Sequence, residues 1–153
     1  MTQPISFTSS SPRFSLPVLS VGQSQKEFSV NQAHALLDAL LHLVVQGEAD
    51  DPPASPAEGE CWIIGSAPTG SWSGQAGRLA AFEAGTWLFV APTEGLRAFD
   101  ATDGQFVRYA EGAWIYSSSI SLPNGGATVD NEARAALEEI VSVLIENGLI
   151  PQG

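Results

Sequence analysis

The sequence predicts an α+β protein, in which an extended N-terminal arm and an amphipathic helix precede an antiparallel β-meander of short hairpins and a C-terminal helix. Apolar residues recur at helical spacing in two segments, near residues 30–45 and 131–147. Between them, short apolar runs alternate with Gly, Pro and Asp, which is typical of strands and tight turns. We therefore expect an arm (1–27), a helix and β-meander domain (28–116), a linker (117–128) and a C-terminal oligomerisation helix (129–153).

The composition predicts a folded protein, and its negative charge argues against anionic partners. The chain has 153 residues, the size of one domain, and 44% of them are hydrophobic, which favours a folded protein. Its formal net charge is -11, and its six Lys and Arg residues are scattered, so we expect neither nucleic acid nor an anionic membrane as a partner. No signal peptide is visible, and the longest apolar block, 39–45, is too short to cross a bilayer. The single cysteine, Cys61, lies in an apolar run and is expected to be a small core residue.

The arm is marked by Pro4, Pro12 and Pro17, which favour extended backbone. It carries too many apolar residues for a free tail, so we expect residues 13–27 to lie along another surface, either of the same chain or of a neighbour. The alternative is a tail that is disordered as far as about residue 12. The residues expected to dock the arm are Gln23, Gln25, Lys26 and Glu27.

The first helix is expected over residues 30–45. Ser29 suits the N-cap, with Gln32 as its capping-box partner, and Gly47 suits the stop. One apolar face is expected, made of Ala33, Leu36, Leu37, Leu40, Leu41 and Val44.

The opposite face of this helix carries a stripe of ligand-type side chains. His34, Asp38 and His42 are spaced at i, i+4 and i+8, a geometry that a metal site can use. We favour a solvated helix face, with a metal at an oligomer axis as the alternative. No metal and no cofactor is therefore predicted.

Six short runs predict the strands of the meander: 62–64, 79–82, 87–90, 96–99, 106–109 and 114–116. One pattern occurs twice in this region, in residues 82–89 and in residues 109–116. Each copy has an aromatic residue, then Gly three positions later, Trp two positions after the Gly, and a second aromatic residue two positions after the Trp. The offset is 27 residues, from Phe82 to Tyr109. Gly85 and Gly112 would supply the positive φ of a hairpin turn in each copy.

The C-terminal helix is expected over residues 131–147, with Asp130 as N-cap and Gly148 after its end. At 100° per residue its apolar arc covers about half of the circumference, wider than one neighbour needs. One neighbour can be its own sheet, and the other is expected to be the same helix of a second copy; full burial in its own monomer is the alternative. The residues expected to form the oligomer contact are Leu137, Ile140, Val141, Leu144 and Ile145.

No pattern in the sequence predicts an enzyme. Both histidines fall on one helix, no serine has a nucleophile-elbow context, and no carboxylate is marked by an apolar setting. Trp72, flanked by small polar residues, is the best candidate for an exposed ring that stacks on a sugar. The alternative function is thus a lectin-like module that contacts glycan through Trp72, and a polysaccharide hydrolase is a remoter third hypothesis.

Blocks between residues 13 and 116 carry a family resemblance. They are Arg13-Phe14-Ser15-Leu16-Pro17, Gly22-Gln23-Ser24-Gln25-Lys26-Glu27, Val30-Asn31-Gln32-Ala33, Leu36-Leu37-Asp38-Ala39-Leu40, Pro56-Ala57-Glu58-Gly59-Glu60-Cys61-Trp62, Gly77, Gly85-Thr86-Trp87, Pro92 and Gly95. On these blocks the chain resembles a domain-of-unknown-function family of alphaproteobacterial prophages, tailed phages and gene transfer agents. The resemblance implies a tail-fibre or tail-tip component with no assigned catalytic residues.

From this resemblance we expect a non-enzymatic structural module of a phage or gene-transfer-agent tail fibre. Its expected partners are copies of itself, most simply in a trimer, together with other tail or baseplate proteins and a host surface glycan. Its expected location is the virion tail, after assembly in the bacterial cytoplasm.

Overall fold

The computed structural model describes residues 10–19, 26–126 and 130–152, without the side chains of residues 26–29. The chain divides into two compact units, and each holds one four-stranded sheet. Unit 1 comprises residues up to 43 and residues 48–91, and unit 2 comprises residues 44–47 and the chain from 92 onward. The predicted α+β class is confirmed.

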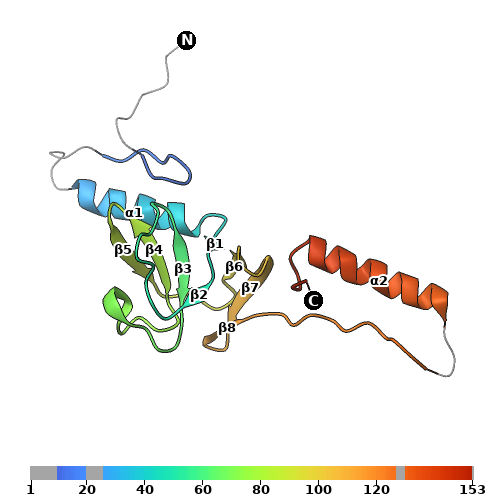
Figure 1. Cartoon of the computed structure of the whole chain (residues 1–153). Helices are drawn as coiled ribbons and strands as arrows, with labels where there is room; N and C mark the ends of the chain where they lie inside the picture. The colour runs from blue at the N-terminus through green and yellow to red at the C-terminus, as the bar shows by residue number, and fades with distance from the viewer. Residues whose placement is uncertain (1–9, 20–25, 127–129, 153) are drawn as a thin grey trace, which may run out of the picture. The chain divides into compact units, whose positions relative to one another are not determined.

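Unit 1 contains a sheet of strand order β2-β3-β4-β5, with helix α1 lying across one of its faces (Figure 1). The hairpin strands pair antiparallel, as predicted, but β2 pairs with β3 in parallel, which the sequence did not predict. The elements are α1 (Lys26–Leu40), β2 (Glu48–Ala49), β3 (Cys61–Ile64), the short 3₁₀ helix η1 (Gly70–Trp72), β4 (Leu79–Glu83) and β5 (Thr86–Val90).

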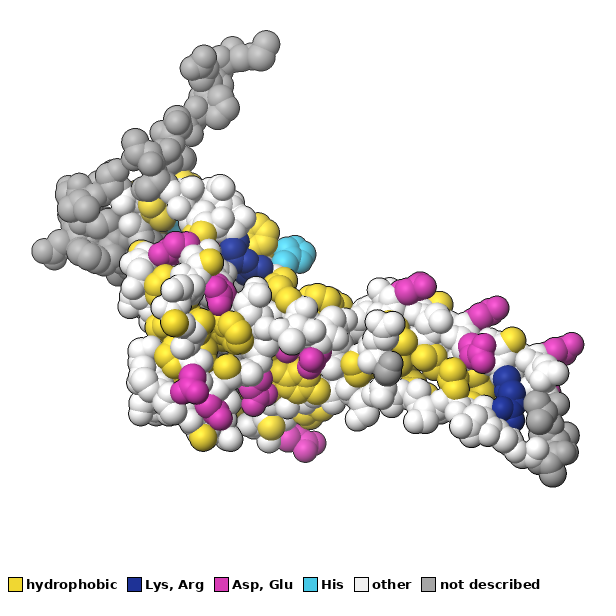
Figure 2. Space-filling view, viewed as in Figure 1, with side chains coloured by type: hydrophobic (Ala, Val, Ile, Leu, Met, Phe, Trp, Pro, Cys, Tyr) yellow, Lys and Arg dark blue, Asp and Glu magenta, His cyan; other side chains and the backbone are white. Residues whose placement is uncertain are grey.

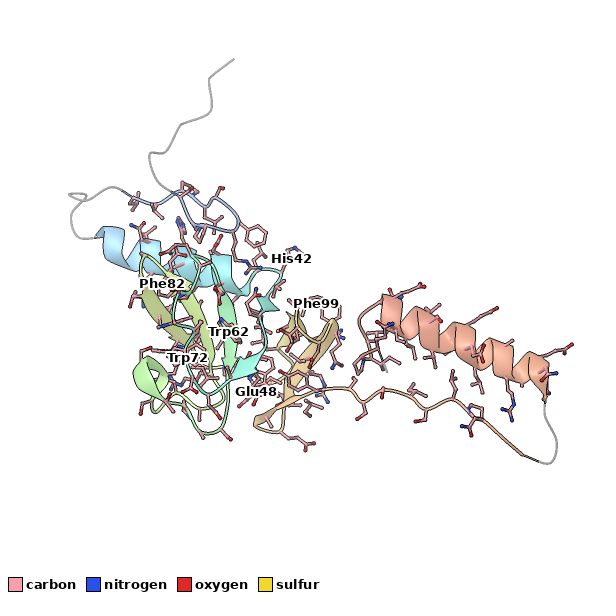
Figure 3. All side chains as sticks on the ribbon, in the orientation of Figure 1. His42, Glu48, Trp62, Trp72, Phe82 and Phe99 are labelled. Atoms are coloured by element: carbon pink, nitrogen blue, oxygen red, sulfur yellow. The ribbon has the colours of Figure 1, made fainter. Side chains whose placement is uncertain are left out.

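Alternation along the strands gives this sheet two apolar faces. Ile64 and Ala80 lie on one face, where the buried Trp72 of η1 packs on them together with the half-buried Trp62 and Trp87. Trp62 and Trp72 are labelled in Figure 3. The opposite face, which α1 covers, presents buried side chains from β3 and β4: Cys61, Ile63, Leu79 and Ala81.

The predicted bounds of the first helix are wrong at both ends. Helix α1 begins at Lys26, so Ser29 lies inside it rather than at the N-cap, and it ends at Leu40. Val44–Val45, predicted as its last turn, forms strand β1 instead, because β-branched residues suit a half-buried strand. Leu37 and Leu41, predicted on the buried face, are largely exposed.

Unit 2 contains a sheet of strand order β1-β6-β7-β8, followed by helix α2. Here too the hairpin strands are antiparallel, and β1 pairs with β6 in parallel. The strands are β1 (Val44–Val45), β6 (Arg97–Asp100), β7 (Gln105–Ala110) and β8 (Ala113–Ile115).

Helix α2 spans Asn131–Glu146 as the sequence predicts. The Asp130 carboxylate accepts a hydrogen bond from the Ala133 N–H at 2.9 Å, which confirms the predicted N-cap. Gly148 has φ 64° after the helix end, and its carbonyl accepts from the Phe106 N–H at 2.6 Å, which ties the C-terminus to β7. No described residue of α2 is buried.

The two sheets repeat one plan. The registers Cys61↔Ala81 and Ile63↔Leu79 in unit 1 correspond to Arg97↔Arg108 and Phe99↔Phe106 in unit 2. The offset is 36 residues in the first strand (61 to 97) and 27 in the second (81 to 108). The internal repeat therefore extends well beyond the hairpins that the sequence displayed.

Each copy closes its hairpin in the same way. The Glu58 carboxylate accepts from the backbone N–H groups of Ala84 (2.7 Å) and Gly85 (2.8 Å) in the β4–β5 turn. Glu94, at the same place in the second copy, accepts from the Glu111 N–H at 3.0 Å in the β7–β8 turn. Both turns have two central residues with positive φ, the type I′ geometry that suits the strand twist.

Replacing Gly85 by Ala is expected to lower the free energy of unfolding by about 1–2 kcal/mol, because an L-residue is strained at φ 75°. A Cβ there would meet no atom within 4 Å, so the cost is backbone strain alone. Gly85→Asn is the matched control, since Asn tolerates this region and should recover much of the loss in urea denaturation. Equal losses for Ala and Asn would contradict the type I′ assignment.

Candidate functional site

A buried carboxylate fixes the N-terminal arm on helix α1. Asp38 is 1% exposed, and its oxygens accept hydrogen bonds from the Ser11 hydroxyl (2.5 Å), the Arg13 N–H (2.9 Å) and the Phe14 N–H (2.7 Å). The Ser11 Oγ in turn accepts from the Leu16 N–H at 3.1 Å. Residues 10–17 therefore fold into a small loop around one side chain of the helix.

The Arg13 side chain adds a second set of hydrogen bonds between the arm and α1. Its guanidinium donates to the carbonyl oxygens of Asp38 (2.8 Å), Ala39 (2.8 Å) and His42 (2.7 Å) at the C-terminal end of α1. These carbonyls lack partners within the helix, and a cation is favourable at this end of the helix dipole. Arg13 thus serves as the C-cap that was assigned to Gly47.

Two further side chains of α1 hold the arm along the helix. Asn31 accepts from the Leu19 N–H at 2.8 Å and donates to the Leu19 carbonyl at 3.0 Å. The His34 Nδ1 lies 2.6 Å from the Pro17 carbonyl. Asn31, His34 and Asp38 lie on one face of α1, so this face binds the arm.

The prediction of a solvated stripe at His34, Asp38 and His42 is therefore wrong. Asp38 is buried under the arm, and His34 is half-buried against Pro17. Only the side chain of His42 is exposed, beside the Phe14 ring at 6.1 Å between centroids. Over the described residues, no group of three His, Cys, Asp or Glu side chains is placed to hold a metal ion.

The described part of the arm docks on the chain itself, one of the two surfaces that the sequence analysis allowed. Gln23 and Gln25 lie outside the described residues. Lys26 and Glu27 begin α1 rather than end the arm, and their side chains are not described either. The contacts that the structure describes come from residues 11–19, and residues 13–19 belong to the segment that the sequence predicts to lie along a surface.

Trp72 is 0% exposed, so the prediction of an exposed ring is wrong. Its loop folds back, and the ring packs at 5.1 Å between centroids on Trp87 and at 6.3 Å on Trp62. Small residues around a tryptophan predicted a solvated loop, whereas here they allow the loop to turn tightly and bury the ring. Trp72 therefore offers no face to a sugar.

Two ionisable groups in unit 1 have perturbed acidity. Burial raises the pKa of the Cys61 thiol to about 12, as expected for a core cysteine. Burial, followed by the charges of Asp38 and Glu58, raises the pKa of Glu83. Glu83 is therefore a carboxyl in a less polar setting, which the sequence did not reveal.

The apolar face of α2 lies open, in unit 2. Leu137 is 44% exposed and Ile140 56% exposed, whereas Val141, Leu144 and Ile145 are half-buried. Val143 is 54% exposed and lines a shallow hollow with Ile140, Leu144, Ala136 and Glu139. Figure 2 shows acidic and hydrophobic side chains side by side along this helix. The five residues predicted for the oligomer contact are thus all at least partly accessible.

Sequence signals for the residues that were missed do exist. Pro56-x-Glu58-Gly59 and Pro92-x-Glu94-Gly95 share a pattern, and each precedes a Gly-x-Trp hairpin, by 26 residues from Gly59 to Gly85 and by 17 from Gly95 to Gly112. Reading the two together would have placed both capping glutamates. For Ser11, Arg13 and Asn31 the local sequence offers no such pattern, because each acts across a long separation.

No helix of the described residues is long and apolar enough to span a membrane.

Asp38→Ala is expected to lower the free energy of unfolding by about 2–4 kcal/mol, because it leaves the donors of Ser11, Arg13 and Phe14 without their acceptor. Urea denaturation measures this change. Asp51→Ala is the matched control, since Asp51 is exposed and bonds only Thr69, and it should cost under about 1 kcal/mol. Similar losses for the two variants would show that the Asp38 contact is not structural.

Cys61 is expected to resist alkylation in the folded chain at about pH 8, because burial both raises its pKa and blocks access to the reagent. The thiol should react fully once urea unfolds the protein, which mass spectrometry detects. A Ser66→Cys variant provides an exposed thiol as the control. Labelling of Cys61 at the rate of that exposed thiol would contradict its place in the core.

Comparison with known proteins gives one family. The family described as "Protein of unknown function (DUF2793)" matches residues 30–115, more than half of the chain. The match covers both sheets but ends before α2. None of the curated proteins compared with the chain matches it. The chain therefore belongs to the DUF2793 family, whose function is unknown.

Proposed function

We propose that this protein is a non-enzymatic structural module that assembles with copies of itself through helix α2, as part of a phage or gene-transfer-agent tail fibre. In this proposal the two sheets form the body of the module, and α2 joins neighbouring copies. A trimer is the simplest assembly, since fibres of this kind are built on threefold symmetry.

The observation that carries this proposal is the unburied apolar face of α2. An exposed helix of 16 residues gains little stability in water unless its apolar side is covered. Ala133, Leu137, Ile140 and Leu144 follow the four-three-four spacing of a coiled-coil seam, and Leu137 and Ile140 are about half exposed. The three-helix arrangement suits the additional apolar residues Ala136 and Val141, one on each side of that seam.

The virion context rests on the resemblance of residues 13–116 to a phage and gene-transfer-agent family. Two features of the described chain agree with a structural role. The acidic composition of the chain keeps separate assemblies soluble. The chemistry-bearing side chains of α1 are used to bind the arm, so they support architecture rather than catalysis.

Leu137→Asp combined with Ile140→Asp is expected to convert the oligomer to a monomer, because each carboxylate would have to be desolvated in the helix contact. Light scattering over a range of protein concentrations gives the mass. Leu37→Asp with Leu41→Asp is the matched control, because these leucines are 56% and 48% exposed in unit 1, take no part in the α2 contact and should leave the mass unchanged. A wild-type chain that stays monomeric at every concentration would refute assembly through α2.

A further inference from the structure

The repeat of the two sheets makes their corresponding faces comparable residue by residue. The face of the first sheet that α1 covers carries Cys61, Ile63, Leu79, Ala81 and Leu88. At the same register positions the second sheet carries Arg97, Phe99, Phe106, Arg108 and Ile115. We refer to these five residues as the Arg97–Arg108 face.

The two faces differ in what covers them. Ile63 and Leu79 are 0% and 1% exposed beneath α1. In the second sheet, Phe106 corresponds to Leu79 and is 39% exposed. Ile115, on the adjacent strand β8, is 41% exposed. In unit 2 the segment at Gly148 lies against Phe99 and Phe106, at one end of the face. A face that binds a helix in one copy of the repeat is therefore largely open in the other.

The charges on the open face indicate the chemistry of what covers it. Arg97 and Arg108 lie directly opposite each other on β6 and β7, an arrangement of like charges that costs stability. The Arg97 guanidinium lies over the Phe106 ring at 5.3 Å, and both arginines are exposed. Two of the six cations of a chain of net charge -11 are gathered here, so the complementary surface is acidic and partly apolar.

Helix α2 has that complementary surface. Successive residues turn by 100°, so Glu139, Val143 and Glu146 fall within about 60° of one another, on the side of the helix away from Leu137. All three are exposed, and Val143 lies between the two carboxylates. The Arg134 side chain of α2 is already engaged with the carbonyls of Pro123 and Gly125 and does not offset this acidic strip.

We propose that the Arg97–Arg108 face binds helix α2 of a second copy through the Glu139–Val143–Glu146 strip, as the first sheet binds α1. Val143 covers Phe106 and Ile115, and the two carboxylates approach the arginines. The seam residues of the same helix remain free for helix–helix contact. This inference rests on the proposed assembly through α2, and it names the second surface that the helix uses.

Charge reversal tests the contact. Arg97→Glu with Arg108→Glu is expected to weaken self-association about tenfold or more, measured by sedimentation equilibrium at low salt. Adding Glu139→Arg and Glu146→Arg to that variant should restore the association constant to within about threefold of the wild type. Glu138→Arg in place of Glu139→Arg is the matched control, because Glu138 points to another side of the helix and should not restore it.

The outcomes separate this inference from the proposed function. An oligomer of unchanged strength in the arginine variant, or equal rescue by the Glu138→Arg control, would overturn the Arg97–Arg108 contact and leave assembly through the seam intact. A monomeric wild type would refute the assembly and this contact together. Arg78→Glu with Lys26→Glu, two cations of unit 1, gives the same change in net charge and serves as its control.

A disulfide distinguishes a second copy from the helix of the same chain. Arg108→Cys with Val143→Cys should form a covalent oligomer under mild oxidation, seen on a non-reducing gel, while the buried Cys61 stays unreactive. Arg108→Cys with Glu138→Cys, which lies about 140° from Val143 around the helix, should cross-link far less. A fast-migrating monomer with an internal disulfide would overturn the proposal, because it would place the chain's own helix on the face.

Discussion

The arrangement of unit 1 depends on the burial of one carboxylate. Taking Asp38 out of water is costly unless its oxygens are hydrogen-bonded, and the donors come from the arm, 24 to 27 residues earlier in the chain. The same loop positions Arg13 on the last carbonyls of α1, which fixes where the helix ends. The helix and the arm therefore stabilise each other, and together they cover the sheet face of Ile63 and Leu79. Asp38 also acts at a distance, since its charge contributes to the raised pKa of Glu83.

A second constraint shapes both sheets. A two-residue hairpin turn exposes backbone N–H groups that no strand partner can satisfy, and Glu58 and Glu94 accept from them. Glu58 precedes β3 and bonds the β4–β5 turn, whereas Glu94 precedes β6 and bonds the β7–β8 turn. Each glutamate therefore connects the segment before the first strand of its sheet repeat to the turn of the following hairpin. This cross-connection explains why the two sheets share one register although their side chains differ.

The sequence predicts those parts of the fold that local periodicity determines. Helix α2 and the six hairpin strands follow from spacing and turn residues, as the Asp130 cap and the Gly85 turn show. The two parallel strands β1 and β2 have only two residues each, too few to show a period. Asp38 and Trp72 were misread for the opposite reason: their neighbours in sequence are polar, but segments distant in the chain, or a folded-back loop, bury them. The polar stripe of α1 is thus an internal contact, which no helical wheel can distinguish from a solvated face.

Two surfaces of unit 2, the apolar face of α2 and the Arg97–Arg108 face of the sheet, are both left exposed at a cost in stability. An apolar helix face without cover and a sheet face with opposed arginines each lower the stability of an isolated chain, by exposed apolar area in one case and by charge repulsion in the other. Either surface alone would indicate only that something is missing. In this chain the two are complementary in charge and both contain exposed apolar side chains, and the first sheet demonstrates that its plan accommodates a helix at the corresponding position. In the proposed contact the Glu139–Val143–Glu146 strip offsets the charge repulsion of the arginines, and the seam of the same helix stays available to other copies, which is why we place the neighbouring helix on this face rather than invoke an unrelated partner.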